Sequence, residues 1–496
     1  MRKYLFLITL FLSPGLSVFA QNSDEGRFSG NLQYDAQTYQ DDKYIGAEAA
    51  KEIILMNTYA NFMYVKGDFS AGTRFEGYMN SLQGFDPVNS GSGFPYAWAK
   101  YKKNNLTVTV GSFYEQFGSG MVLRTYEDKT LGYDNAMNGI RMKYQIGNGI
   151  TLKAVYGRQR ELQLFVDNST RVKLGTGIVR GIDGEFFLND IFTGMAEKKT
   201  QISFGASFVS KYEKDDSDKY ILPENVGAAA ARFLVSRGKI NLSGEYAYKT
   251  MDPSAGGIDN SNGNVGQNYI YKNGQGAFIT ATYSQKGLGI SLMAKSIDNM
   301  NFRSNRKAKL NNLSINYIPD ITKNQTYAFA AMYPYGTQIN GEAGFQAEII
   351  YKIPKKSMLG GKYGTGITLS YSRMFSLEKE AIHDTVPLNR NNGTVGYKTS
   401  LISFGDKLFY QDINLEINKK FNKKVKGVFT IQQLTYDNGI LHSASINSPI
   451  TSELTEGEHD DHLIKAITVI ADVSYKFTSR KSLRTELQHL STEQHM

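Results

Sequence analysis

Apolar and polar residues alternate one by one in many short segments of the chain. In the segment 69–79 (FSAGTRFEGYM), Phe69 and Phe75 share one face, whereas Arg74 and Glu76 share the other. Successive side chains of a β-strand point to opposite faces, so this pattern predicts strands with one apolar face and one polar face. The same alternation recurs in segments 201–208 (QISFGASF), 341–351 (GEAGFQAEIIY), 412–418 (DINLEIN) and 467–477 (ITVIADVSYKF).

The connections between these segments alternate between short and long. Short polar turns occur at 66–68, 102–105, 147–148, 237–238, 286–287 and 478–482, and long polar stretches at 212–224, 250–268 and 437–462. This alternation is typical of a transmembrane β-barrel, with tight periplasmic turns and longer external loops. We therefore predict an all-β fold, a large antiparallel transmembrane β-barrel of about 20 to 22 strands. A soluble sandwich would also alternate, and a propeller would show a repeat of about 40 to 50 residues, which is not visible.

The N-terminus carries the pattern of a secretory signal peptide. Arg2 and Lys3 precede an apolar run at 4–12, and small residues end at Ala20. We predict a signal peptide at 1–20 and one outer-membrane barrel domain at 21–496. The absence of Cys excludes disulfides and a lipid-modified N-terminal cysteine, and 32 Tyr and 28 Phe suit the aromatic girdles of a barrel.

Charged residues of a barrel should point into the lumen, because Arg or Lys at the bilayer midplane costs about 2–4 kcal/mol. The connection from Glu115 to Ala136 is long and partly apolar, so we expect it to fold into the lumen as a constriction. The charges could then set selectivity, or form an ion-paired plug. The expected lumen charge cluster comprises Arg74, Glu76, Glu115, Arg124, Arg141, Lys143, Arg158, Arg180 and Glu185.

Motifs for other chemistry are weak. The glycines of 111–120 lack the Lys-Ser/Thr that follows a phosphate loop, and no G-x-S-x-G is present. In EGEHDDH (456–462), His459, Asp461 and His462 are weak candidate metal ligands, and a solvated loop is the preferred interpretation. The basic run 418–427 lies between two alternating segments, which indicates a turn and not a nucleic-acid site. We expect no enzymatic activity, no cofactor and no nucleic-acid partner.

Four stretches carry a resemblance to a known family: 28–42 (FSGNLQYDAQTYQDD), 75–87 (FEGYMNSLQGFDP), 111–128 (GSFYEQFGSGMVLRTYED) and 177–186 (GIVRGIDGEF). From about Phe28 to its end, the chain resembles a family of predicted Bacteroidota outer-membrane β-barrel proteins of unknown function. The resemblance implies architecture and location in the cell outer membrane. It brings no activity, ligand or catalytic residue.

The expected function is a channel or transport protein for small or anionic solutes, with a charge-lined lumen. The alternative is a non-conducting barrel subunit of an outer-membrane assembly or secretion complex. Outer-membrane lipid, lipopolysaccharide and other envelope proteins are the expected partners. The last hairpin, whose final segment is 483–490 (LRTELQHL), would leave the last strand running outward, so we also expect the chain to lack at least one strand of a complete barrel.

Overall fold

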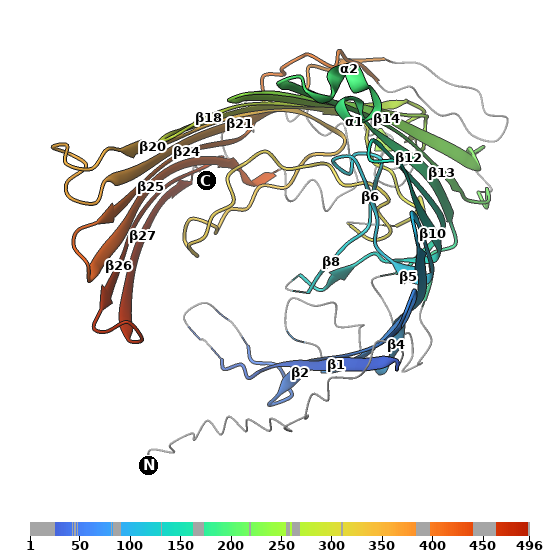
Figure 1. Cartoon of the computed structure of the whole chain (residues 1–496), viewed down its shortest axis with the longest axis horizontal. Coiled ribbons are helices and arrows are strands. Elements are labelled where there is room, and N and C mark those ends of the chain that lie inside the picture. The colour runs from blue at the N-terminus through green and yellow to red at the C-terminus, as the bar shows by residue number, and fades with distance from the viewer. Residues whose placement is uncertain are drawn as a thin grey trace.

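Nineteen strands form one antiparallel sheet in the described part of the chain. The computed structural model describes residues 25–41, 43, 46, 48–80, 82, 91–129, 131–161, 173–217, 220–253, 258–259, 268–308, 311–382, 397–439 and 463–494. Each strand of the sheet pairs with its neighbours in sequence order, and the sheet curves into a barrel wall (Figure 1). The strands of the wall are β1 (Arg27–Gln37), β2 (Leu55–Lys66), β3 (Phe69–Met79), β4 (Gly91–Lys103), β5 (Leu106–Phe113), β10 (Met137–Ile146), β11 (Ile150–Gln159), β12 (Ile178–Phe187), β13 (Thr200–Tyr212), β14 (Asn225–Arg237), β15 (Ile240–Lys249), β18 (Gly274–Gln285), β19 (Leu288–Asp298), β20 (Gly341–Ile353), β21 (Thr365–Phe375), β24 (Leu408–Lys420), β25 (Val425–Asp437), β26 (Leu463–Lys476) and β27 (Ser482–Gln494).

The remaining elements are short. Two single-turn helices follow β12, and eight two-residue strands pair in twos. These are α1 (Leu188–Ile191), α2 (Thr193–Ala196), β6 (Gln116–Phe117), β7 (Leu123–Arg124), β8 (Glu127–Asp128), β9 (Tyr133–Asp134), β16 (Ile258–Asp259), β17 (Asn268–Tyr269), β22 (Glu380–Ala381) and β23 (Tyr397–Lys398). No helix among the described residues is both long and apolar enough to cross a membrane.

The predicted all-β fold with one large antiparallel barrel sheet is confirmed. The segment 69–79 coincides with β3, and the other alternating segments lie within strands, except that segment 467–477 extends one residue beyond β26. The six short turns fall between strands where the sequence placed them, for example between β10 and β11. The wall has 19 strands in the described residues, slightly fewer than the 20 to 22 predicted.

Among the described strands, the strand at each end of the sheet has one partner. β1 pairs with β2, β27 pairs with β26, and no pairing joins β1 to β27 among the described strands. Figure 1 shows these two ends facing each other across an opening in the wall. The expectation of missing strands stays a prediction, and the predicted signal peptide lies outside the described residues.

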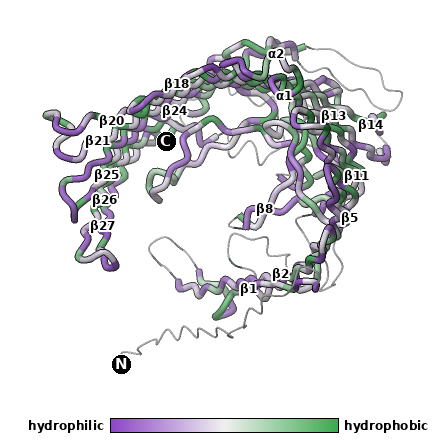
Figure 2. The backbone as a smooth tube through the Cα atoms, in the orientation of Figure 1, coloured by the Kyte–Doolittle hydropathy of each residue, from purple (hydrophilic) through white to green (hydrophobic). Residues whose placement is uncertain are grey.

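The outward face of the wall is apolar and exposed. Ile140, Tyr156, Ile182 and Phe208, on four consecutive strands, are between 45% and 62% exposed. The alternate positions on these strands point inward, where many are buried or charged. Figure 2 shows the resulting interleaving of hydrophobic and hydrophilic positions along the strands. The outward face of the sheet is therefore apolar, whereas its inward face combines charged residues with buried apolar ones.

Two connections lie inside the wall and supply a core there. The inner connection (residues 115–136) contains β6 to β9, and the crossing segment (residues 299–340) joins β19 to β20. Phe117, Met121 and Leu123 of the inner connection have no exposed surface. They pack with inward side chains of the wall, and with residues of the crossing segment, in one apolar cluster. The expected folding of residues 115–136 into the barrel is thus what the structure shows.

The crossing segment reaches from the inner connection to the last strands. The amide N–H of Arg124 donates to the Ile315 carbonyl at 2.9 Å. Further along, Lys323 Nζ donates to Asn414 Oδ1 of β24 at 2.6 Å, and the Tyr327 hydroxyl donates to Asp472 of β26 at 3.1 Å. These contacts fix both inner segments against inward polar side chains of the wall.

Candidate functional site

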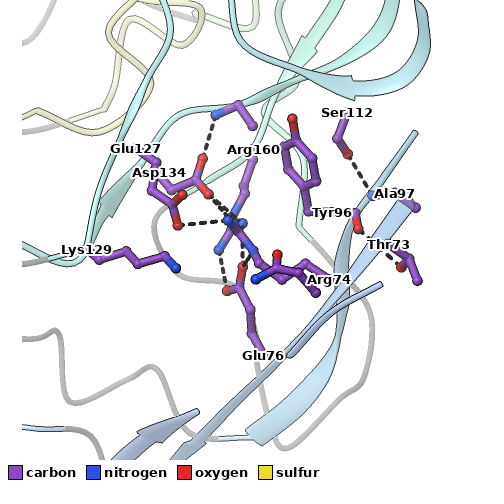
Figure 3. A network of polar contacts seen from close by, with 12 residues as sticks. Thr73, Arg74, Glu76, Tyr96, Ala97, Ser112, Glu127, Lys129, Asp134 and Arg160 are labelled. Atoms are coloured by element: carbon purple, nitrogen blue, oxygen red, sulfur yellow. Dashed lines mark hydrogen bonds and ion pairs between the residues drawn. The ribbon is translucent and has the colours of Figure 1, made fainter. Parts of the chain in front are cut away.

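Five charged side chains form a buried network where the inner connection meets the wall (Figure 3). Arg74 of β3 contacts Glu76 at 2.6 Å, Glu127 at 2.8 Å and Asp134 at 2.7 Å. Arg160, just after β11, donates to both oxygens of Glu76 and to Asp134 Oδ2, at 3.1, 2.7 and 2.8 Å. The network thereby joins three parts of the chain: β3, the inner connection and the end of β11.

Three carboxylates share two guanidinium groups in this network, and tyrosines supply additional hydrogen bonds. The Tyr78 hydroxyl donates to Glu76 Oε2 at 2.9 Å, and the Tyr114 hydroxyl donates to Asp134 Oδ2 at 2.9 Å. Burial raises the pKa of Glu127, although Arg74 acts in the opposite direction. Charged hydrogen bonds in a site shielded from water are strong and directional, so this network holds the inner connection in one position.

A second charged group lies on the inner wall beside β6. Arg232 of β14 contacts Asp183 at 2.8 Å and Glu185 at 3.1 Å, and donates to Ser207 Oγ at 2.8 Å. Gly205 lies opposite Arg232 in the ladder, and a Cβ there would come within 2.4 Å of the guanidinium carbon. Glycine at this position therefore makes room for the arginine against the wall.

Glu245 of β15 holds the tip of the inner connection. Its Oε2 accepts a hydrogen bond from the Ser119 N–H at 2.8 Å. Gly118 has φ +54°, and a Cβ on it would come within 2.6 Å of this carboxylate, so the close approach requires glycine. Within the described part of the structure, Glu245 Oε1 has no hydrogen-bond partner.

A cavity of about 440 Å³ borders this second group. Arg232, Glu185 and Glu245 line it together with Ser119 and Phe278. Pockets of about 300–1,000 Å³ are typical for small molecules. The inner surface next to the inner connection therefore offers both signs of charge, hydroxyl groups and phenylalanine rings to a small solute.

The structure places most of the predicted residues on the inner side of the wall, in separate groups and not in one cluster. Arg74 and Glu76 belong to the buried network, and Glu185 contacts Arg232. Glu115 lies 3.5 Å from Arg141 and 3.7 Å from Lys153.

Two further predicted residues also lie on the inner side. The Arg124 guanidinium stacks over the rings of Tyr126 and Tyr317, at 4.5 and 4.0 Å from their centroids. Lys143 is exposed and shares the inward face of β10 with Arg141.

Arg158 and Arg180 do not face the lumen, and this part of the prediction needs correction. On β11, Val155 and Gln159 are buried inward, so Arg158 shares the outward face with the exposed Tyr156. On β12, Gly181 faces Phe117 of the inner connection, which directs Arg180 outward. Both arginines lie near a strand end, where the cost of a charge facing lipid falls to about 0–1 kcal/mol.

Sequence reasoning missed several inward charged residues. Arg160, Asp134 and Glu127 complete the first network, and Arg232, Asp183 and Glu245 form the second group. Asp183, Arg232 and Glu245 occupy inward-facing positions in the alternating pattern of their strands, and this pattern could have identified them. No local signal marks Arg160 or Glu127, because both lie outside the regular strands of the wall.

Other ion pairs continue around the inner wall. Lys211 contacts Asp252 at 2.7 Å, and Lys295 of β19 contacts Glu342 of β20 at 2.7 Å. Their side chains are almost fully buried. The inner wall therefore carries charged residues well beyond the first two groups.

Metal binding has no support in the described residues, which hold no group of three or more His, Asp or Glu side chains arranged for an ion. The candidate ligands His459, Asp461 and His462 lie outside the described residues.

Comparisons with known proteins identify solved structures that are similar to the chain and a family whose model matches it. The solved structures that are similar to the chain include the following three. OccK3 (OpdO) of Pseudomonas aeruginosa is 10% identical, with 94% of this chain and 95% of that chain covered and a TM-score of 0.36. OccAB4 of Acinetobacter baumannii is 10% identical, with 96% and 99% covered and a TM-score of 0.34. The outer membrane protein OprD of Pseudomonas aeruginosa is 10% identical, with 95% and 94% covered and a TM-score of 0.34.

No curated protein matches the chain. A family model matches residues 1–496, and the chain belongs to that family, which is described as "Family of unknown function (DUF6029)".

Proposed function

We propose that the protein is an outer-membrane β-barrel channel that passes small polar or charged solutes beside a constriction formed by the inner connection. The observation that carries this proposal is the distribution of side chains on the two faces of the wall. Exposed residues such as Ile140, Tyr156 and Ile182 face outward, whereas Arg74, Asp183 and Arg232 face inward. An apolar exterior suits lipid, and antiparallel barrels are the form in which strands span the bacterial outer membrane.

A wall of this size leaves room for a path. Barrel diameter grows with strand number, and barrels of 16–18 strands enclose an aqueous channel unless something fills it. Here the inner connection and the crossing segment occupy part of the interior. The cavity beside Arg232 and Glu245 borders the tip of the inner connection, where a passing solute would meet both charges. Selectivity would then depend on these residues and on Arg141.

One observation favours a second candidate function, a non-conducting subunit of an outer-membrane assembly. The apolar cluster of Phe117, Met121 and Leu123 packs inside the wall, where a water-filled channel would be expected to carry polar side chains. If the two inner segments close the interior completely, the barrel would act through its surfaces and not through its lumen.

Single-channel recording in planar bilayers separates the two functions. We expect stable ionic current from the purified protein, and Arg141→Ala should shift ion selectivity toward cations because it removes an inward positive charge. Arg237 faces outward at the C-terminal end of β14. Arg237→Ala is therefore the matched control and should leave selectivity unchanged. A barrel that inserts, remains silent and purifies with other envelope proteins would instead support the subunit function.

A further inference from the structure

Two arginines interrupt the apolar outward face at one rim of the wall. Arg158 and Arg180 are both exposed, and they lie near the ends of adjacent strands β11 and β12. Arg180 is directly opposite Tyr156 on one side and Ser210 on the other. Among the described residues, neither guanidinium has a carboxylate within salt-bridge distance. Two exposed arginines on the outward surface are suited to an anionic ligand.

The level of Arg180 coincides with one boundary of the apolar belt. Ladder pairing places Arg180 opposite Ser210, and Ser210 opposite Gly227 of β14. Along β14, the ten residues from 227 to Arg237 span roughly 33 Å at about 3.3 Å per residue. A strand tilt of about 40° reduces this to roughly 25 Å in height, the height of the apolar band of an outer-membrane barrel. Arg180 and Arg237 therefore lie toward opposite ends of the wall.

The rim with Arg158 and Arg180 is the one that carries long connections. The chain joins β11 to β12 through residues 160–177 at this rim, whereas the turn between β10 and β11 at the other rim is only 147–149. Long connections of such barrels are external, so this rim belongs to the outer leaflet. In a bacterial outer membrane, that leaflet presents phosphorylated glycolipid at the level of these arginines.

Local hydrogen bonds prepare Arg180 for a phosphate. Its Nη2 donates to Ser210 Oγ at 3.2 Å and to Asn225 Oδ1 at 3.0 Å, which holds the guanidinium flat along the sheet. With Nη2 engaged in these two bonds, Nε and Nη1 of Arg180 are the groups that would donate to phosphate oxygens, and Arg158 is one strand away to add a second positive charge. Tyr156 lies beside Arg180, and Ile182 continues the apolar surface along β12, where acyl chains would pack.

We propose that Arg158 and Arg180 form a binding site for a phosphate of lipopolysaccharide on the outer surface of the barrel. This inference rests on the proposed placement in the outer membrane. It adds a specific lipid site that is separate from the lumen and from any transport activity.

The test measures lipopolysaccharide binding to the full chain in detergent or nanodiscs, by native mass spectrometry or fluorescence titration. We expect Arg158→Ser/Arg180→Ser to weaken binding by about tenfold to a hundredfold, because charged hydrogen bonds to the phosphate are lost. Arg237→Ser, which removes an outward arginine at the other end of the wall, should leave the affinity unchanged. Lipopolysaccharide treated with phosphatase should bind the wild type as weakly as intact lipopolysaccharide binds the double variant.

Three results would overturn the proposal. These are equal affinity of the double variant and the wild type, undiminished binding of the dephosphorylated lipid, and equally strong competition by phosphatidylglycerol, which would show a site for any anionic lipid. Heat-modifiable gel migration verifies that each variant is folded, and bilayer current is recorded from the same preparations. If the double variant inserts, conducts and binds lipopolysaccharide as tightly as the wild type, only the lipid site is refuted. If the wild type never inserts, the membrane placement itself is refuted.

Discussion

Replacing Arg160 with methionine should loosen the attachment of the inner connection to the wall. Arg160 is only 4% exposed and makes three hydrogen bonds, two to Glu76 and one to Asp134. Methionine fills much of the same volume without a charge. The variant would leave three carboxylates around the single guanidinium of Arg74, with the Glu76 carboxylate fully buried.

The expected cost follows from this imbalance. Removing one partner of a buried ion pair typically costs about 3–5 kcal/mol, because the remaining charge stays buried without compensation. Tyr78 still donates to Glu76, and water can enter from the lumen, so we expect a value toward the lower end. Urea unfolding in detergent micelles, followed by tryptophan fluorescence and heat-modifiable migration, measures the free energy of unfolding. Open-channel noise in bilayers should rise as the inner connection becomes mobile.

Two further variants show whether the ion pairs cause this effect. Glu76→Gln combined with Arg160→Met should recover part of the loss, with a coupling energy of about 0.5–3 kcal/mol between the two sites. Lys307→Met, in an exposed pair with Asp216, should cost no more than about 1 kcal/mol. A loss below about 1 kcal/mol for Arg160→Met, or strict additivity with Glu76→Gln, would refute the view that this network holds the inner connection.

Three other variants probe the inner connection. Phe117→Ala empties a fully buried site in the apolar cluster, so the free energy of unfolding should fall by about 3–5 kcal/mol in the same urea assay. A Cβ at Gly181 would come within 2.8 Å of the Phe117 ring. Gly181→Val should therefore displace the inner connection and change the single-channel conductance. Glu245→Gln keeps an acceptor for the Ser119 N–H but removes a charge beside the cavity. It should lower cation preference in reversal-potential measurements with little change in stability, and unchanged selectivity would argue against a solute path at Glu245.

Much of the wall could be predicted from the sequence because its determinants are local. Alternation within a segment and the length of the next turn identify a strand pair, and pairs such as β10 with β11 need no information from distant residues. The interior could not be predicted in the same way. Arg160 contacts Glu76 across 84 positions, and Asn135 contacts the Ser314 carbonyl across 179, so these contacts exist only after the wall has curved around the two inner segments.

The error at Arg158 and Arg180 shows which of two sequence rules should take precedence. The cost of charge in lipid suggested that every arginine on a strand points inward, yet alternation placed Arg158 with Tyr156 and Leu152, and Arg180 with Ile182. Alternation is fixed by backbone geometry, whereas the cost of a charge depends on depth and falls to about 0–1 kcal/mol near the interface. A charge that appears on the apolar side of a strand is therefore better read as a marker of the membrane boundary than as a lumen residue. By this criterion Arg237, which shares the outward face of β14 with Phe233 at the other end of the wall, would mark the second boundary of the proposed membrane placement.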